Sequence, residues 1–151
     1  MSFSRDEPPP RNGDVVELRI PRSPAYVSVA RRTVECVAQR LAFERAEIDD
    51  VKLAVGEACN NAIRHGSDDS DKAPVTIRCT VDSGGLAIEI RNYHPVGTPP
   101  PTTDPAPDFS KEGGLGFRMM RQLVDDVEFV WGEDFALTRL TKTIRKPSQR
   151  K

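Results

Sequence analysis

The chain of 151 residues lacks a long apolar run and a large excess of one charge. No segment approaches the ~20 apolar residues that a membrane-spanning helix needs, and the polar opening MSFSRDEPPP lacks the apolar centre of a signal peptide. With a net charge of −1, the chain also lacks the concentrated basic surface that nonspecific nucleic-acid binding requires. We therefore expect a cytoplasmic protein that contacts neither a membrane nor nucleic acid directly.

Cysteine is scarce, and the three cysteines, Cys36, Cys59 and Cys79, are scattered along the chain. An odd number without regular spacing fits neither a disulfide framework nor a zinc site. We expect Cys59 to pack as a small apolar residue.

Length and composition predict one domain with a substantial core. Residues 1–13 are rich in proline and charge and are expected to be disordered. The domain is expected to span residues 14–145, and residues 146–151 form a short basic tail.

Hydrophobic periodicity and turn residues predict the element order β-α-α-β-β-loop-α-β-β. The expected elements are a strand at 14–20, helices at about 24–43 and 49–64, strands at 75–81 and 86–91, a helix from the glycine-rich run at 113–116 to about 127, and strands at 127–131 and 136–144. Helices come mainly early and strands late. This order favours an α+β fold, a two-layer sandwich in which helices cover one face of a mixed, largely antiparallel sheet.

The most informative segment is VKLAVGEACNNAIRHG, residues 51–66. Its apolar residues recur at helical spacing on one side, namely Val51, Val55, Ala58 and Ala62. Glu57, Asn61 and His65 step by four along another side. A carboxylate there could accept a proton and an amide oxygen could hold Mg²⁺. The same spacing is also common on solvated helix faces.

A second informative segment joins a long loop to a helix start. Residues 92–114 are proline-rich and lack periodicity, which is typical of a lid, a binding loop or a disordered segment. The loop ends in Gly113, Gly114 and Gly116, where small residues and free helix N–H groups can cradle an anion. By itself, such a start is more often a simple cap. Together, the two segments pair a cation ligand with a phosphate cradle.

These segments, VKLAVGEACNNAIRHG and EGGLGFRMMRQLVDDVEF, resemble the N-box helix and second glycine box of the GHKL ATPase superfamily. Within it, the chain resembles the stand-alone bacterial anti-sigma-factor serine/threonine kinases of partner-switching systems, over about residues 14–144. The resemblance implies a Bergerat-type ATP-binding fold that uses ATP and Mg²⁺.

Matched residue by residue, the resemblance assigns Glu57 as the catalytic carboxylate and Asn61 as the Mg²⁺ ligand. It assigns phosphate contacts to the backbone of the second glycine box, formed by Gly113, Gly114, Leu115 and Gly116. Residues 98–113 correspond to the ATP lid.

The base-binding side departs from the family pattern. Asn92 stands where the family has an aspartate that accepts from the adenine amino group, and Gly97 can replace a glycine only if one residue is inserted. Ala136 stands near the place of a threonine that helps to hold adenine. We expect His94, within this loop, to be solvated.

The resemblance implies a kinase that phosphorylates a serine of a STAS-domain anti-anti-sigma protein, sequesters an alternative sigma factor and forms a homodimer. Two alternatives stay open. One is a regulator of the same fold that acts by contact with little turnover, which the altered base-binding side favours. The other is an ATPase module serving a histidine-kinase relay.

Overall fold

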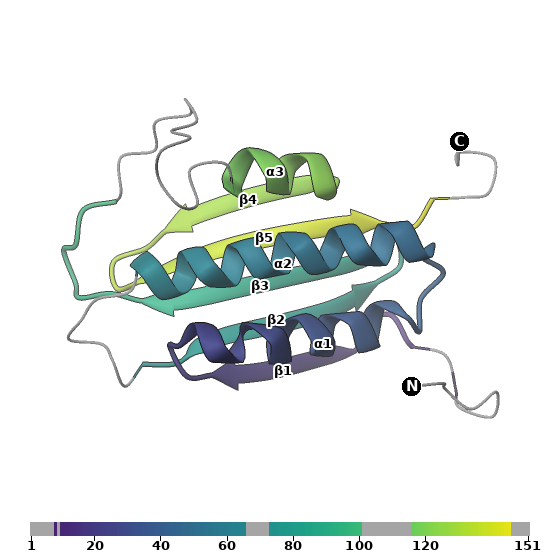
Figure 1. Cartoon of the computed structure of the whole chain (residues 1–151), viewed down its shortest axis with the longest axis horizontal. Coiled ribbons are helices and arrows are strands. Elements are labelled where there is room, and N and C mark those ends of the chain that lie inside the picture. Colours follow the sequence, from purple (N-terminus) through teal and green to yellow (C-terminus); the bar gives the residue numbers. More distant parts are fainter. Residues whose placement is uncertain (1–7, 9, 66–72, 101–115, 146–151) are drawn as a thin grey trace.

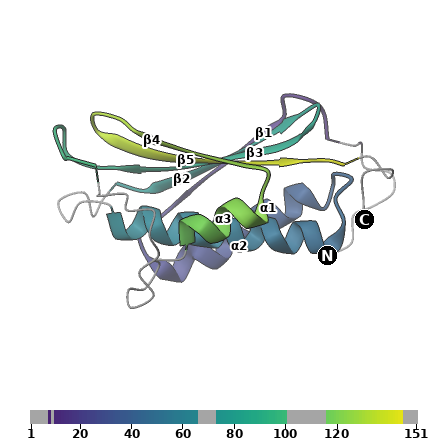
Figure 2. The same cartoon turned by 90° about the horizontal axis from the view of Figure 1, so that it is seen from above.

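The computed structural model describes residues 8, 10–65, 73–100 and 116–145. These residues form two layers, with a five-stranded sheet on one side and helices packed against one of its faces (Figures 1 and 2). The predicted α+β sandwich is confirmed. The predicted basic tail at 146–151 and most of the segment predicted to be disordered lie outside the described residues.

The sheet is antiparallel at every described strand pair, in the order β1-β2-β3-β5-β4. Its strands are β1 (Val15–Ile20), β2 (Val75–Asp82), β3 (Gly85–Tyr93), β4 (Asp126–Trp131) and β5 (Phe135–Thr143). All five lie within about two residues of their predicted positions. Strand β1 pairs with β2 although two helices separate them in the sequence, and both helices lie on the same face of the sheet (Figure 2).

The helices are a short 3-10 turn (Pro24–Tyr26), α1 (Val27–Ala38), α2 (Arg45–His65) and α3 (Gly116–Leu123). Helix α1 ends before the expected position near residue 43, because the amides of Arg40 and Leu41 bond back only three residues. Helix α3 also ends early, and Val127 lies in β4 instead.

Helix α2 begins four residues before its predicted start. The Glu47 carboxylate accepts a hydrogen bond of 3.0 Å from the backbone N–H of Glu44, which satisfies a donor at the helix entrance. The acidic residue of the first turn is therefore Glu47 and not Asp49.

The core lies between α2 and the sheet. All four residues of the predicted apolar stripe, Val51, Val55, Ala58 and Ala62, are buried, and Cys59 is buried beside them as expected. From the sheet, alternate residues such as Ile77, Ile88 and Leu140 are fully buried on the helix-facing side. One continuous apolar cluster therefore holds the two layers together.

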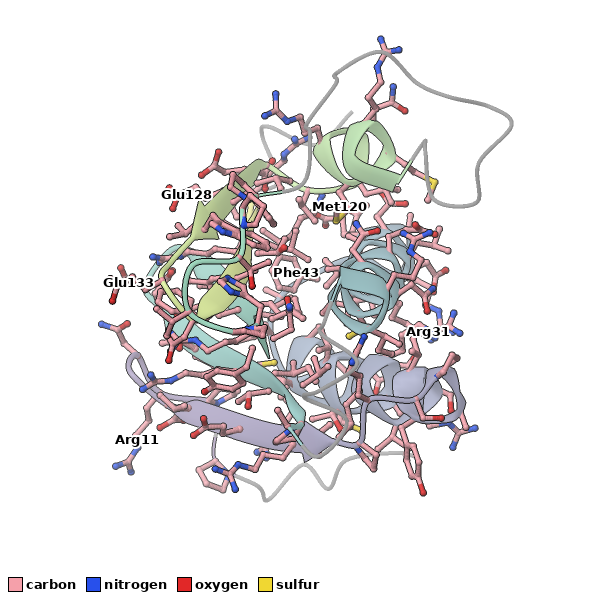
Figure 3. The ribbon with its side chains drawn as sticks, turned by 90° about the vertical axis from the view of Figure 1, so that its left-hand side faces the viewer. Arg11, Arg31, Phe43, Met120, Glu128 and Glu133 are labelled. Carbon is pink, nitrogen blue, oxygen red and sulfur yellow. The ribbon has the colours of Figure 1, made fainter. Side chains whose placement is uncertain are left out.

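Packing of its middle and contacts at its C-terminal end hold helix α3 in place. Met120 is fully buried and points toward the interior beneath α3 (Figure 3). The ammonium of Lys142, on β5, donates to the Leu123 carbonyl at 3.2 Å, where a positive charge suits the helix C-terminus. The Thr143 amide donates to Asp125 at 2.6 Å, just beyond the helix end.

The β2–β3 hairpin confirms the predicted turn. The Gly84 amide donates to the Asp82 carboxylate at 2.9 Å. Gly85 has a φ of +153°, and a Cβ there would lie 2.1 Å from the Lys142 carbonyl oxygen. Only glycine permits this close approach of β3 to β5.

No helix among the described residues combines the length and apolarity needed to cross a membrane.

The two-layer core predicts a difference between Ile88 and Leu53, which lies on α2 and is 49% exposed. We expect Ile88→Ala to lower the free energy of unfolding by about 2–5 kcal/mol, because it opens a cavity under α2. Leu53→Ala should change it by no more than about 0.5 kcal/mol. Urea denaturation of both variants checks this, and equal losses would contradict the assignment of the core.

Candidate functional site

Packing of α2 decides where its polar side chains lie. Lys52 forms an ion pair with Glu35 of α1, and Gly56 lies under the Arg31 side chain of α1. At about 100° per residue, Glu57 and Asn61 fall on the opposite flank of α2, away from α1. Both are half-buried and one turn apart, on the side of α2 that faces α3 rather than α1.

Three segments meet at one end of the molecule. The C-terminal end of β3, the C-terminal half of α2 and the first residue of α3 lie at the same end, at the left in Figure 1. Asn92 is near the end of β3, on its helix-facing side, and Gly116 begins α3. The fold thus gathers Glu57, Asn61 and Asn92 near a helix start. Gly113, Gly114 and Leu115 lie outside the described residues.

The Asn61 side chain already has a partner. Its amide oxygen accepts a hydrogen bond from the guanidinium of Arg64, three residues further along α2. This contact shows that the oxygen is accessible to a positive charge, and a bound cation would displace the guanidinium. Among the described residues, no group of three or more His, Cys, Asp or Glu side chains is placed to hold a metal ion. A cation here would therefore depend on the Asn61 oxygen and on oxygens of a ligand.

Asn92 is buried and only partly satisfied. It is 5% exposed and lies opposite Ala136 in the sheet. Its amide nitrogen has no hydrogen-bond partner within the described part of the chain. An unmet donor of this kind costs about 1–3 kcal/mol, which a ligand offering an acceptor would recover. An amide also presents an acceptor beside its donor, matching the adjacent donor and acceptor of a purine edge.

His94 is buried rather than solvated, which corrects the sequence expectation. Its ring is 4% exposed and stacks on Trp131, with ring centroids 4.1 Å apart and planes at 9°. The two ring nitrogens each lie 3.0 Å from a carbonyl oxygen, those of Pro95 and Phe135. The cause is tertiary: the β4–β5 hairpin brings Trp131 beside the end of β3, and nothing local in the sequence signals it.

Gly97 lies in a tight turn that follows His94. Its φ is +85°, and the Thr98 amide donates to the Pro95 carbonyl at 3.1 Å. The indole N–H of Trp131 then donates to the Thr98 carbonyl at 2.9 Å. Gly97 therefore permits this turn, because glycine adopts a positive φ without steric cost. The predicted lid continues through residues 101–113, outside the described residues.

The buried cysteines are not nucleophiles. Burial raises the pKa of both Cys59 and Cys79 to about 12, so each remains a thiol at neutral pH. The site therefore offers a carboxylate, amide groups and a helix start, which is a set suited to binding a polyanion with a cation.

Comparison with known proteins agrees with this arrangement. Residues 20–142 match the family model described as the histidine kinase-like ATPase domain. The chain therefore belongs to the family of histidine kinase-like ATPase domains.

Named relatives fall within one group of proteins. The chain is 36% identical over 127 residues to the serine-protein kinase RsbW of Bacillus pumilus, with 76% of this chain and 77% of the relative covered. It is 34% identical over 125 residues to the serine-protein kinase RsbW of Bacillus velezensis, with 76% and 77% covered. A crystal structure of the RsbU and RsbW domains of a Mycobacterium tuberculosis protein has a similar fold, with a TM-score of 0.66 at 15% identity. That match covers 89% of this chain and 33% of the solved one.

The first site prediction concerns Asn61. We expect Asn61→Ala to abolish Mg²⁺-dependent ATP binding while the fold stays intact, because the residue lies on the flank of α2 away from the apolar stripe. Asn60→Ala is the matched control, since Asn60 is the exposed neighbour. Calorimetric titration with ATP·Mg²⁺ compares them. Wild-type binding by the Asn61 variant would remove this residue from the metal site.

The second site prediction concerns Asn92. Asn92→Asp supplies a charged acceptor for the adenine amino group, a stronger bond than the neutral amide gives by ~1 kcal/mol. We expect ATP to bind several-fold more tightly. GTP should gain nothing, because its ring carries a carbonyl oxygen where the new carboxylate would repel it. The ratio of ATP to GTP affinity, measured for wild type and variant, checks this, and an unchanged ratio would separate Asn92 from base recognition.

Proposed function

We propose that this chain is an ATP-dependent serine-protein kinase and an anti-sigma factor. Its substrate is a serine of a STAS-domain anti-anti-sigma protein, and its second partner is an alternative sigma factor. Relatives named serine-protein kinase, at 34–36% identity over three quarters of each chain, support the activity. The observation that carries the proposal is the gathering of Glu57, Asn61 and the start of α3 at one end of the molecule.

To catalyse phosphoryl transfer, a protein mainly has to position the reactants and neutralise the charge of the phosphates. Asn61 would hold Mg²⁺ through its amide oxygen, which is a donor that suits this hard cation. Bound there, Mg²⁺ would neutralise the charge of the phosphates. Arg64, which now donates to Asn61, is released on cation binding and can turn toward the phosphates.

Glu57 acts as the general base in this proposal. It is half-buried on the flank of α2 away from α1 and accepts the proton of the substrate serine hydroxyl. Backbone N–H groups of residues 113–116 donate to phosphate oxygens at the N-terminus of α3. Asn92 accepts from the adenine amino group through its amide oxygen.

A second candidate function is a regulator that acts by contact with little turnover. The base-binding side favours it, because Asn92 stands where the resemblance places an aspartate, and the buried His94 ring lies two residues further on. The two candidates differ in whether the chain transfers phosphate to its partner.

One experiment decides between the two functions. The purified chain is incubated with ATP·Mg²⁺ and a STAS-domain protein encoded in the same genome, and the STAS protein is examined for phosphoserine by mass spectrometry. Stoichiometric phosphoserine supports the kinase. ATP binding in the absence of any phosphoserine, together with a stable complex, supports the contact-only regulator.

Glu57→Gln tests the proposed base. The variant keeps size and hydrogen bonding, so we expect unchanged ATP affinity and a phosphotransfer rate lower by about 10²–10⁴-fold. Asp50→Asn is the matched control, because it removes a carboxylate from the same flank of α2 two turns earlier. Single-turnover kinetics of both variants give the comparison. A Glu57 variant that transfers phosphate at the wild-type rate would exclude this role.

A further inference from the structure

The side-chain amide of Asn92, near the end of β3, is buried and still lacks a hydrogen-bond partner. It is 5% exposed, and its amide nitrogen meets no acceptor within the described part of the chain. Among the described residues, no hydrogen bond of this side chain fixes which way the amide faces. Because buried donors are normally paired, this orphan donor points to a ligand that completes it.

The residues beside Asn92 on the helix-facing side of the sheet are small or chemically adaptable. Ala136, directly opposite on β5, is 3% exposed and offers no polar side-chain group. Thr138 lies on the same side two residues further along β5, and its hydroxyl can both donate and accept. We call Asn92, Ala136 and Thr138 the base site. Within it, only the Asn92 amide has a donor and an acceptor at fixed positions relative to each other.

An amide can pair with two different purine edges. Its donor and acceptor lie side by side, and a rotation of about 180° exchanges them. In one orientation, the oxygen accepts from the adenine 6-amino group and the nitrogen donates to adenine N1. In the other, the nitrogen donates to the guanine 6-oxo group and the oxygen accepts from the guanine N1–H. Both pairings use the nitrogen that now lacks a partner.

We propose that the base site binds guanine as well as adenine, so that GTP is a second phosphoryl donor for this chain. The inference rests on the proposed kinase function and adds a donor substrate for the same site. The transfer itself is the same as with ATP. The bond from the γ-phosphorus to the β,γ-bridging oxygen breaks, the serine oxygen forms the new bond, Glu57 takes the serine proton, and GDP leaves.

The pairing chemistry sets the expected selectivity. Because either base forms a similar pair of hydrogen bonds with Asn92, we expect the affinities for ATP and GTP to lie within about tenfold of each other. A site with a fixed donor or a fixed acceptor rejects the other base by a much larger factor, because a buried polar group is left unpaired. A small ratio of the two affinities is therefore the signature of the amide.

The test compares ATP, GTP and inosine triphosphate (ITP) in calorimetric titrations of the full chain with Mg²⁺ present. ITP has the 6-oxo group and N1–H of guanine but lacks its 2-amino group, so it isolates the edge that pairs with Asn92. All three nucleotides should bind to wild type with affinities within about tenfold of one another. The chain is also incubated with each nucleotide and a STAS-domain protein encoded in the same genome, and phosphoserine should form with GTP as with ATP.

Two variants connect this tolerance to Asn92. Asn92→Asp removes the donor and sets a carboxylate against the 6-oxo group, so GTP and ITP should bind at least about tenfold more weakly while ATP does not weaken. Asn92→Leu is similar in size and uncharged, and it removes both donor and acceptor, so all three affinities should fall by similar factors. Asn60→Asp, on the exposed side of α2, adds the same charge elsewhere and should leave the affinity ratios unchanged. Circular dichroism checks that each variant is folded.

The possible results separate this inference from the kinase proposal. Wild type that binds ATP but neither GTP nor ITP overturns the inference, while phosphoserine formed with ATP shows that the kinase proposal stands. ITP binding without GTP binding overturns GTP as a donor. If the charge of Asn92→Asp prevents folding, Asn92→Leu decides alone, and wild-type affinities in a folded Asn92 variant overturn the role of this residue. A wild-type chain that binds no nucleotide overturns both proposals.

Discussion

The burial of one side of α2 against the sheet is the interaction on which the rest of the structure depends. Val51, Val55 and Ala58 are fully enclosed, so the helix cannot rotate without exposing them. With rotation fixed, Glu57 and Asn61 must lie on the flank. The ion pair of Lys52 with Glu35 fixes the other flank on α1, and its hydrogen bond holds the pKa of the Glu35 carboxyl below its usual value.

The end of β3 contains two buried polar side chains in opposite situations. His94 has a carbonyl oxygen 3.0 Å from each ring nitrogen and a stacked indole, so its ring is enclosed by contacts within the protein. Asn92, two residues earlier, keeps an amide nitrogen without a partner among the described residues. Buried donors are normally paired, so Asn92 is the group at this end that still has hydrogen-bonding capacity for a ligand.

The strand register gives the two faces of the sheet different side chains, apolar on one face and charged on the other. Inward residues such as Ile77, Ile88 and Leu140 form the floor of the core. The residues between them include Arg78, Glu89 and Arg139, which lie in register on the face that the helices do not cover. A slip of one residue would exchange the two sets and bury charge under α2. The register that secures the core therefore also fixes the alternation of charge on the uncovered face.

Local patterning in the sequence determined the elements and the stripe of α2, because periodicity and turn residues act over a few neighbours. The spacing of Glu57 and Asn61 along one side of the helix could also be recognised from the sequence. Tertiary structure alone decided the burial of His94 under Trp131, the contact of Lys142 with Leu123, and the alignment of Glu17 with Glu128 across the sheet. Each of these joins residues far apart in the chain, and no local preference encodes which distant strands become neighbours or in which register they pair.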